Sequence, residues 1–191
     1  MSHLLFFDTE TTGIPEWQKP SGAECQPHLV QLAAVIVDEQ TQEITDVMYV
    51  TIRADNWVIP QETIDIHGIT NEQSLLVGVS EELAISQFIN FWNGYKQIAF
   101  STTFDRRIIR IALKRYMSKK IQDDWHFCDY ECAMILAQKH LGLVKYPKLT
   151  KVYEHFYGIP LDGAHDAMAD TIAAMKVYFS IKNEQKLSHK G

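Results

Sequence analysis

Asp8 and Glu10 lie two residues apart, directly after the apolar run 4–7, in the stretch LLFFDTETTG. Side chains at positions i and i+2 of a β-strand point to the same face, so we expect these carboxylates side by side at the end of a buried strand. Two like charges that close resist ionisation unless a cation lies between them. The pair therefore indicates a cation site; the alternative is that the strand simply reaches solvent there.

Two further aspartates occupy positions where an apolar side chain is expected. Asp105 lies one turn before the apolar stripe of a helix predicted over 104–118, and Asp170 has the same place in a helix predicted over 166–183. A buried carboxylate costs several kcal/mol unless it is protonated or contacts a cation or a metal ion. Either aspartate could instead be a buried hydrogen-bond acceptor, but together with the first pair they favour a metal site.

His165 lies five residues before Asp170, in the stretch GAHDAMAD. Because five residues turn an α-helix by about 140°, the two side chains would face different directions on one helix. We therefore expect His165 in the preceding loop, where Gly163 makes a turn plausible. A histidine there could act as a general base, and the alternative is an ordinary surface or core residue. Asp166 lies one turn before Asp170, either at the same site or as a helix-start acid favoured by the helix dipole.

The elements that would position these residues follow from hydrophobic periodicity. A first strand is followed by a long polar loop over 13–28 and then by two strands joined by a short turn, which favours antiparallel neighbours. Helices dominate the second half of the chain, so we expect an α/β fold with helices covering a mixed sheet. The expected strands are 4–7, 29–38, 46–54 and 97–101, and the expected helices are 80–92, 104–118, 130–141, 149–157 and 166–183.

The composition fits one globular domain. The chain has 191 residues, 46% of them hydrophobic and 22% charged, and we expect a domain over 1–183 with a flexible tail over 184–191. No apolar run approaches the ~20 residues of a membrane span, and the sparse cysteines fit a reducing compartment, so we expect a cytoplasmic protein. The net charge of −6 argues against a general basic coat for nucleic acid, but not against an enzyme that grips phosphates through acid-bound metal ions.

The acids and the histidine together resemble the motifs of a known family. In chain order the similar segments are FDTETTG (7–13), IHGIT (66–70), FD (104–105) and HDAMAD (165–170). They resemble the motifs of the DnaQ-like 3′–5′ exonucleases of the DEDDh type, and the resemblance extends from Leu4 to about Tyr178. It implies a ribonuclease H-like fold, in which helices flank a mixed central sheet.

The resemblance also implies roles for individual side chains. Asp8, Glu10 and Asp170 would bind one divalent ion, and Asp8 and Asp105 would reach a second. Oxygen ligands suit Mg²⁺ or Mn²⁺, and two such ions would activate water and neutralise the leaving oxygen of a phosphodiester. His165 would accept the proton of the attacking water.

Residues near the acids are candidates for substrate binding. Thr11 and Thr12 would hold the terminal nucleotide, and His67 would contact its sugar or base. The family often carries a His–Asn pair where this chain has Phe100 and Ser101, so we expect the adjacent aspartate and substrate strand to be held differently. The candidate substrate-binding residues are Thr11, Thr12, His67, Ser101 and Phe104.

Two features further from the acids also suit a nucleic acid. Trp17 could stack on a base, or it could only pack within the long loop. Arg106, Arg110 and Lys114 form a basic row on the predicted helix 104–118, which would either steer phosphates or be a solvated helix face.

The function that these patterns favour is metal-dependent 3′–5′ exonuclease activity that releases nucleoside 5′-monophosphates. We expect DNA, single-stranded or frayed, because the chain resembles the DNA-directed members of the family more closely. The alternatives are an exoribonuclease of the same family, a ribonuclease H-type endonuclease, and a non-catalytic module that binds nucleic acid or a polymerase. A DNA polymerase or a repair complex is a possible partner.

Overall fold

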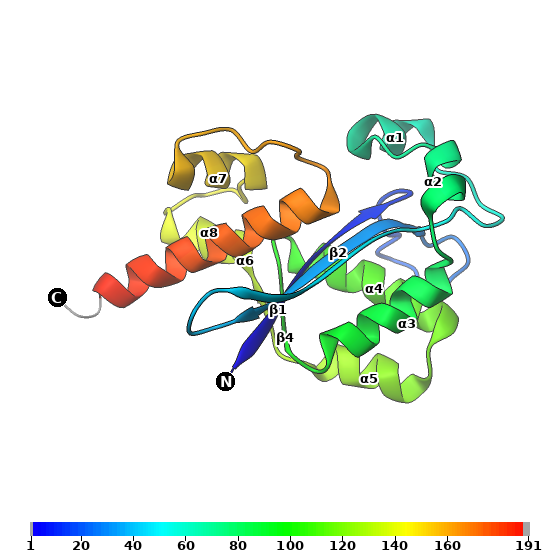
Figure 1. Cartoon of the computed structure of the whole chain (residues 1–191), viewed down its shortest axis with the longest axis horizontal. Coiled ribbons are helices and arrows are strands. Elements are labelled where there is room, and N and C mark those ends of the chain that lie inside the picture. Colours follow the sequence, from blue (N-terminus) through cyan, green and yellow to red (C-terminus); the bar gives the residue numbers. More distant parts are fainter. Residues whose placement is uncertain (1, 189–191) are drawn as a thin grey trace.

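The computed structural model of the chain describes residues 2–188, which form a five-stranded sheet between groups of helices (Figure 1). The strands are β1 (His3–Thr11), β2 (Leu29–Asp38), β3 (Ile44–Thr51), β4 (Lys96–Ala99) and β5 (Tyr130–Cys132). They lie in the order β3–β2–β1–β4–β5. The pairs β1–β2 and β2–β3 are antiparallel, and the pairs β1–β4 and β4–β5 are parallel. The sheet is therefore mixed, as the sequence predicts.

Side-chain alternation along β1 divides the core between the two faces of the sheet. Its apolar residues are Leu4 and Phe6 on one face and Leu5 and Phe7 on the other. Asp8 and Glu10 continue the even-numbered series within the same strand. They therefore point to the face of Leu4 and Phe6, at the carboxyl end of the strand.

Helices cover both faces. The odd-numbered face of β1 packs against α3 (Glu81–Trp92), α4 (Thr102–Tyr116) and α5 (Lys119–Phe127), with Trp125 fully buried between them. The opposite face packs against α6 (Ala133–His140), α7 (Leu149–Tyr157) and α8 (Ala167–Ser188). Two short helices, α1 (Gln61–His67) and α2 (Asn71–Val77), lie near the carboxyl end of β1, apart from α7 (Figure 1). Among the described residues, no helix is long and apolar enough to cross a membrane.

Some expected boundaries are wrong. The helix predicted over 130–141 begins only at Ala133, because residues 130–132 pair with β4 as β5. The last helix, predicted over 166–183, continues to Ser188 as α8 and so includes residues 184–188 of the predicted tail; residues 189–191 lie outside the described part. The sequence pattern also does not anticipate α1, α2 and α5, which are short and rich in polar residues.

Candidate active site

Four carboxylates from three elements meet at the carboxyl end of β1. Asp8 and Glu10 come from β1 itself, Asp105 from the first turn of α4, and Asp170 from the first turn of α8. α4 starts directly after β4, the parallel neighbour of β1, and α8 packs across β1 and β2. The negative charges of Asp105, Asp170 and Glu10 all act on Asp8. The fold thus brings together the acids that the sequence predicts as a site.

Asp105 is held by Thr9, which sequence analysis missed. The Thr9 hydroxyl donates to Asp105 Oδ1 at 2.8 Å, and the Thr9 backbone N–H donates to the same oxygen at 3.2 Å. Thr9 points toward α4 because it lies between the two acids, on the opposite face of β1. Ser101 stands where the family often has Asn, and its hydroxyl makes no hydrogen bond with any described residue, so Asp105 is held without it.

His165 lies in the turn before α8, as predicted. Its backbone has φ of 71°, in the left-handed region, and its N–H donates to Asp170 Oδ2 at 3.2 Å. Glu10, His165 and Asp170 each have one carboxylate oxygen or ring nitrogen placed so that the three atoms lie within 4.8 Å of one another. Residues other than glycine adopt this conformation only where the surrounding structure holds them in it. Such residues are common at active sites.

A set of hydrogen bonds fixes this turn against the sheet. Asp166 Oδ1 accepts from the N–H groups of the first turn of α8, so Asp166 is the helix-start acid. Asp166 Oδ2 accepts from the hydroxyl of Tyr49 on β3, and that hydroxyl accepts from Gln31 on β2 at 2.9 Å. Gln31 Oε1 in turn accepts from Ala167 N–H at 2.9 Å. Tyr49 and Gln31 therefore position the His165 turn, and sequence analysis missed both.

The carboxylates disfavour one another's ionisation. Burial raises the pKa of Glu10 to about 8, with contributions from the charges of Asp170 and Asp105. Burial raises the pKa of Asp105 to about 7, although the Thr9 hydrogen bonds oppose the shift. Burial and neighbouring carboxylates also raise the pKa of Asp8 and of Asp170. Perturbations of this kind are typical of sites that bind a cation or transfer a proton.

These residues fit a divalent metal ion. The donors are carboxylate oxygens, which hard cations such as Mg²⁺ and Mn²⁺ prefer. Asp170 Oδ1 is buried without a hydrogen-bond partner among the described residues, so it is available as a ligand. A cation here would offset both the burial and the mutual repulsion that raise the four pKa values.

Metal-free protein is expected to lose stability as the pH rises. Above pH ~4 these carboxyls ionise in the unfolded state, while burial keeps them protonated in the folded state until pH 7–8. Over that range the unfolded state binds fewer protons, so rising pH favours unfolding. We expect the Tm in EDTA to fall by roughly 5 °C or more between pH 5.5 and 9 relative to Asp8→Asn, and Mn²⁺ to restore it at pH 9. Thermal unfolding scans measure this; parallel Tm curves for the two proteins would contradict it.

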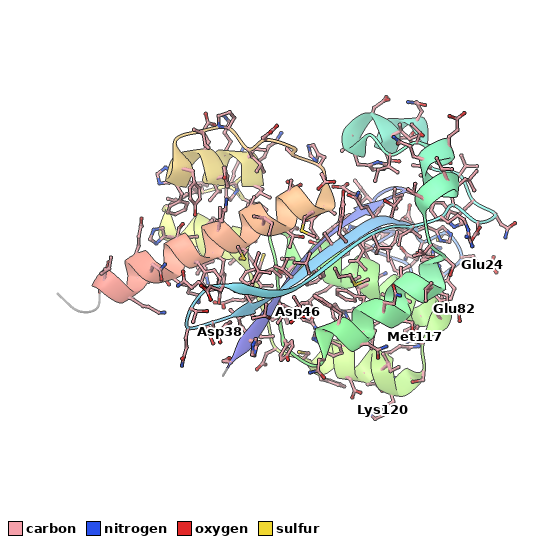
Figure 2. All side chains as sticks on the ribbon, viewed as in Figure 1. Glu24, Asp38, Asp46, Glu82, Met117 and Lys120 are labelled. Carbon is pink, nitrogen blue, oxygen red and sulfur yellow. The ribbon has the colours of Figure 1, made fainter. Side chains whose placement is uncertain are left out.

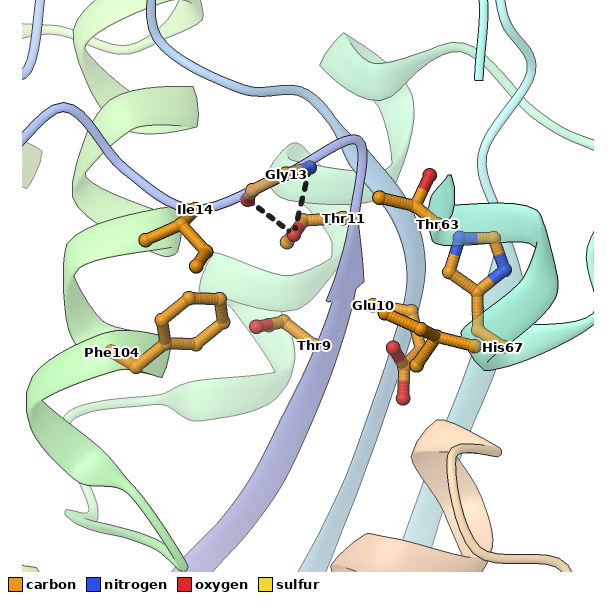
Figure 3. A pocket seen from close by; sticks show the side chains of 9 residues that line it. Thr9, Glu10, Thr11, Gly13, Ile14, Thr63, His67 and Phe104 are labelled. Carbon is orange, nitrogen blue, oxygen red and sulfur yellow. Dashed lines mark hydrogen bonds between the residues drawn. The ribbon is translucent and has the colours of Figure 1, made fainter. Parts of the chain in front are cut away.

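A cavity adjoins Glu10 (Figure 3). It has a volume of about 190 Å³ and opens to solvent. Ile14 and Phe104 lie on one side of the end of β1, and His67 lies on the other, in α1 (Figure 3). His67 Nε2 is buried and has no hydrogen-bond partner among the described residues. The lining residues are Thr9, Glu10, Thr11, Gly13, Ile14, Thr63, Ile66, His67 and Phe104.

The cavity contains three of the predicted substrate-binding residues, Thr11, His67 and Phe104. Ser101 and Thr12 are not among its lining residues. The Thr12 hydroxyl accepts from the backbone N–H of His28 at 2.9 Å, so it fastens the two ends of the long loop together. The sequence did not reveal this engagement, because His28 is distant along the chain.

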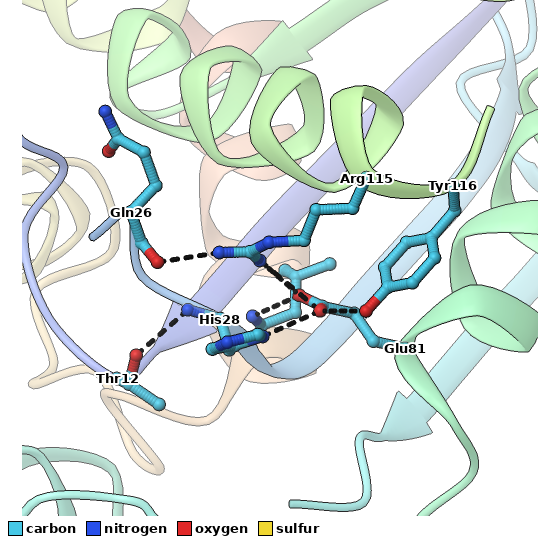
Figure 4. A network of polar contacts seen from close by, with 7 residues as sticks. Thr12, Gln26, His28, Glu81, Arg115 and Tyr116 are labelled. Atoms are coloured by element: carbon cyan, nitrogen blue, oxygen red, sulfur yellow. Dashed lines mark hydrogen bonds and ion pairs between the residues drawn. The ribbon is translucent and has the colours of Figure 1, made fainter. Parts of the chain in front are cut away.

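Buried Glu81 anchors the end of that loop to two helices (Figure 4). Its Oε1 accepts from Leu29 N–H at 2.9 Å and from Arg115 at 3.2 Å. Its Oε2 accepts from the Tyr116 hydroxyl at 2.9 Å and lies 2.8 Å from His28 Nδ1. The loop that carries Ile14 to the cavity is therefore held by a fully partnered carboxylate.

Glu81→Gln is expected to lower the free energy of unfolding by about 3 kcal/mol. The change leaves Arg115 without its carboxylate and turns one acceptor into a donor facing other donors, and breaking a buried ion pair typically costs about 3–5 kcal/mol. The matched control is Glu82→Gln, an exposed neighbour on the same helix (Figure 2). Urea denaturation measures both variants, and equal stabilities would show that the network contributes little.

The mixed sheet flanked by helices, with the acids at the carboxyl end of β1, has the ribonuclease H-like architecture that the sequence motifs imply. The model of an exonuclease family, RNase_T, matches residues 5–178. The chain therefore belongs to this exonuclease family, whose members hydrolyse phosphodiester bonds. No curated protein sequence matches the chain significantly.

Solved structures of E. coli exonuclease I have a similar fold. The complex with a dT13 oligonucleotide superimposes with a TM-score of 0.77 at 20% identity and covers 100% of this chain and 43% of that one. The dA16 complex gives 0.73 at 21% identity, covering 92% and 40%. A zinc-bound complex with single-stranded DNA gives 0.75 at 22% identity, covering 97% and 41%. The chain thus spans less than half the length of these proteins, and at this identity the likeness concerns the fold.

Proposed function

We propose that this chain is a metal-dependent exonuclease that removes nucleoside 5′-monophosphates from the 3′ end of single-stranded or frayed DNA. The observation that carries the proposal is the meeting of Glu10, His165 and Asp170 within 4.8 Å, beside two further acids and an adjoining cavity. The complexes of E. coli exonuclease I with DNA oligonucleotides support DNA as the substrate.

Asp8, Glu10, Asp105 and Asp170 would hold the metal ions, with Mg²⁺ or Mn²⁺ as the proposed occupants. Bound divalent ions would lower the pKa of a water molecule and neutralise charge on the leaving oxygen. A zinc-bound form of E. coli exonuclease I is among the similar structures, which supports a divalent ion as the occupant.

The chain's own residues would supply the proton transfer and the orientation. His165 would accept the proton of the attacking water at an imidazole nitrogen, because its turn places the ring beside Glu10 and Asp170. The cavity would take the terminal nucleoside, with Ile14 and Phe104 against the base and His67 at its polar edge. Tyr49 would act only as a positioning residue, through Asp166.

A 5′-labelled DNA strand tests this function. With Mn²⁺ or Mg²⁺ we expect a ladder that shortens from the 3′ end, and EDTA or Asp8→Asn should abolish it. Internal cuts would indicate an endonuclease, and no cleavage would indicate a non-catalytic module. A matched RNA strand under identical metal and salt decides between the DNA enzyme and an exoribonuclease.

A further inference from the structure

The helix α4 is rich in basic residues and begins at the candidate active site, to which its first turn contributes Asp105. Its sequence TTFDRRIIRIALKRY contains five basic residues and one acid, in a chain whose net charge is −6. Two of the five are engaged by the fold: Arg115 pairs with Glu81, and Arg106 donates to the carbonyls of Trp125 and His126 at 3.0 Å. Arg106 is buried, so its predicted part in a phosphate-steering row is wrong.

The remaining three, Arg107, Arg110 and Lys114, form what we call the arginine face. They follow one another at i, i+3 and i+7, so they lie along one side of the helix. None has a carboxylate partner among the described residues: Arg107 donates to backbone carbonyls, Lys114 donates to Gln122, and Arg110 has no hydrogen-bond or ion-pair partner.

The two arginines of this face have N–H groups that donate no hydrogen bond within the described part of the chain. The Nε atoms of Arg107 and Arg110 are buried without an acceptor among the described residues. Burial, and next the charge of Arg107, lower the pKa of Arg110. Neighbouring cations without an anion repel one another, so a ligand with negative charges would be favoured on this face.

The arginine face continues from the cavity that adjoins Glu10. Phe104 lines the cavity and lies one turn before Arg107 on α4. On the loop side, Trp17 lies three residues after the cavity residue Ile14, is 51% exposed, and has its ring centroid 5.9 Å from the Arg107 guanidinium. From Phe104 to Lys114 the helix rises about 15 Å, room for roughly four phosphates at the ~3.4 Å spacing of a stacked strand.

We infer that Arg107, Arg110 and Lys114 bind the phosphates of the substrate strand upstream of its 3′ end, with the Trp17 ring stacking on a base. The inference rests on the proposed function, because the proposed function assigns the terminal nucleotide to the cavity from which the strand would extend. A single strand supplies regularly spaced negative charges and bases, which match a row of cations beside an exposed aromatic ring.

Binding of a fluorescent dT12 strand in EDTA tests the inference without catalysis. We expect the double variant Arg110→Gln/Lys114→Gln to raise the Kd about tenfold at 0.1 M salt and to flatten the slope of log Kd against log salt by roughly 0.7 for each phosphate that is no longer neutralised. The control Lys120→Gln also removes a positive charge, but on α5. Lys120 lies away from α1, the helix whose His67 lines the cavity (Figure 2). This control should change neither quantity. An unchanged Kd or salt slope in the double variant would overturn the inference.

Hydrolysis separates this inference from the proposed function. The kcat/KM of the double variant is compared with that of the wild type on dT12 and on the dinucleotide dT2. We expect the loss to be about tenfold larger on dT12 than on dT2. Equal losses on both lengths would show that the face supports the fold rather than the strand. A wild-type protein that binds dT12 in a salt-dependent way but cleaves neither strand would refute the proposed function and leave the strand-binding face standing. If the double variant bound dT12 as tightly as the wild type but bound an acidic peptide more weakly, the face would be assigned to a protein partner and the inference would be overturned.

Discussion

Asp8→Asn and Glu10→Gln are each expected to lower kcat/KM by at least about 10³-fold while leaving the protein folded. Metal ions contribute several kcal/mol of charge stabilisation in the transition state, and about 4 kcal/mol corresponds to a thousandfold change in rate. Each substitution keeps the size of the side chain and removes only the charge that holds the cation. Steady-state hydrolysis of a 5′-labelled strand measures the loss.

The matched controls are Asp46→Asn and Glu24→Gln, which make the same changes at exposed positions (Figure 2). They should retain wild-type activity. The two site variants have a second, opposite signature, because each removes a repelling carboxyl: in EDTA at pH 8 they should unfold at a higher temperature than the wild type. A site variant that is both active and no more stable would show that these acids are ordinary polar residues.

His165→Ala is the second change with a large expected effect. Removal of a general base typically costs about 10²–10⁴ in rate, so kcat should fall by that factor. The affinity for Mn²⁺ should remain close to that of the wild type, because the carboxylates stay in place. Single-turnover hydrolysis measures the chemical step, and calorimetric titration with Mn²⁺ measures the affinity.

The control for this variant is His155→Ala, an exposed histidine on α7. It should leave both quantities unchanged. The ring of His165 lies close enough to Glu10 and Asp170 to be a ligand itself, so the alternative has a clear signature. A loss of Mn²⁺ affinity as large as the loss of turnover would make His165 a ligand rather than a base.

The parts of the site that follow local rules could be predicted from the sequence. Alternation along β1 placed Asp8 and Glu10 on one face, and the apolar stripes placed Asp105 and Asp170 at helix starts that face the sheet. The geometry of five helical residues required His165 to lie in a turn. Each of these conclusions depends only on neighbours along the chain.

The contacts that hold these residues could not be predicted, because they depend on pairing between distant segments. Tyr49 reaches Asp166 only because the register of β2 with β3 places it on the site face of the sheet. Arg106 looked like part of a solvated row, and only the end of α5, which the pattern did not reveal, shows where its guanidinium is used. Short elements such as β5 are decided by their partners rather than by their own residues.

Calorimetric titration of Mn²⁺ into the metal-free protein, in buffers of different ionisation enthalpy, tests the metal site most directly. At pH 7 the raised pKa values, about 8 for Glu10 and about 7 for Asp105, keep protons on the site. Because bound metal requires ionised ligands, we predict saturable binding that releases at least about one proton at pH 7 and clearly fewer at pH 9. Absence of saturable binding, or binding at pH 7 that releases no proton and persists in Asp8→Asn, would contradict the assignment of these carboxylates as a metal site.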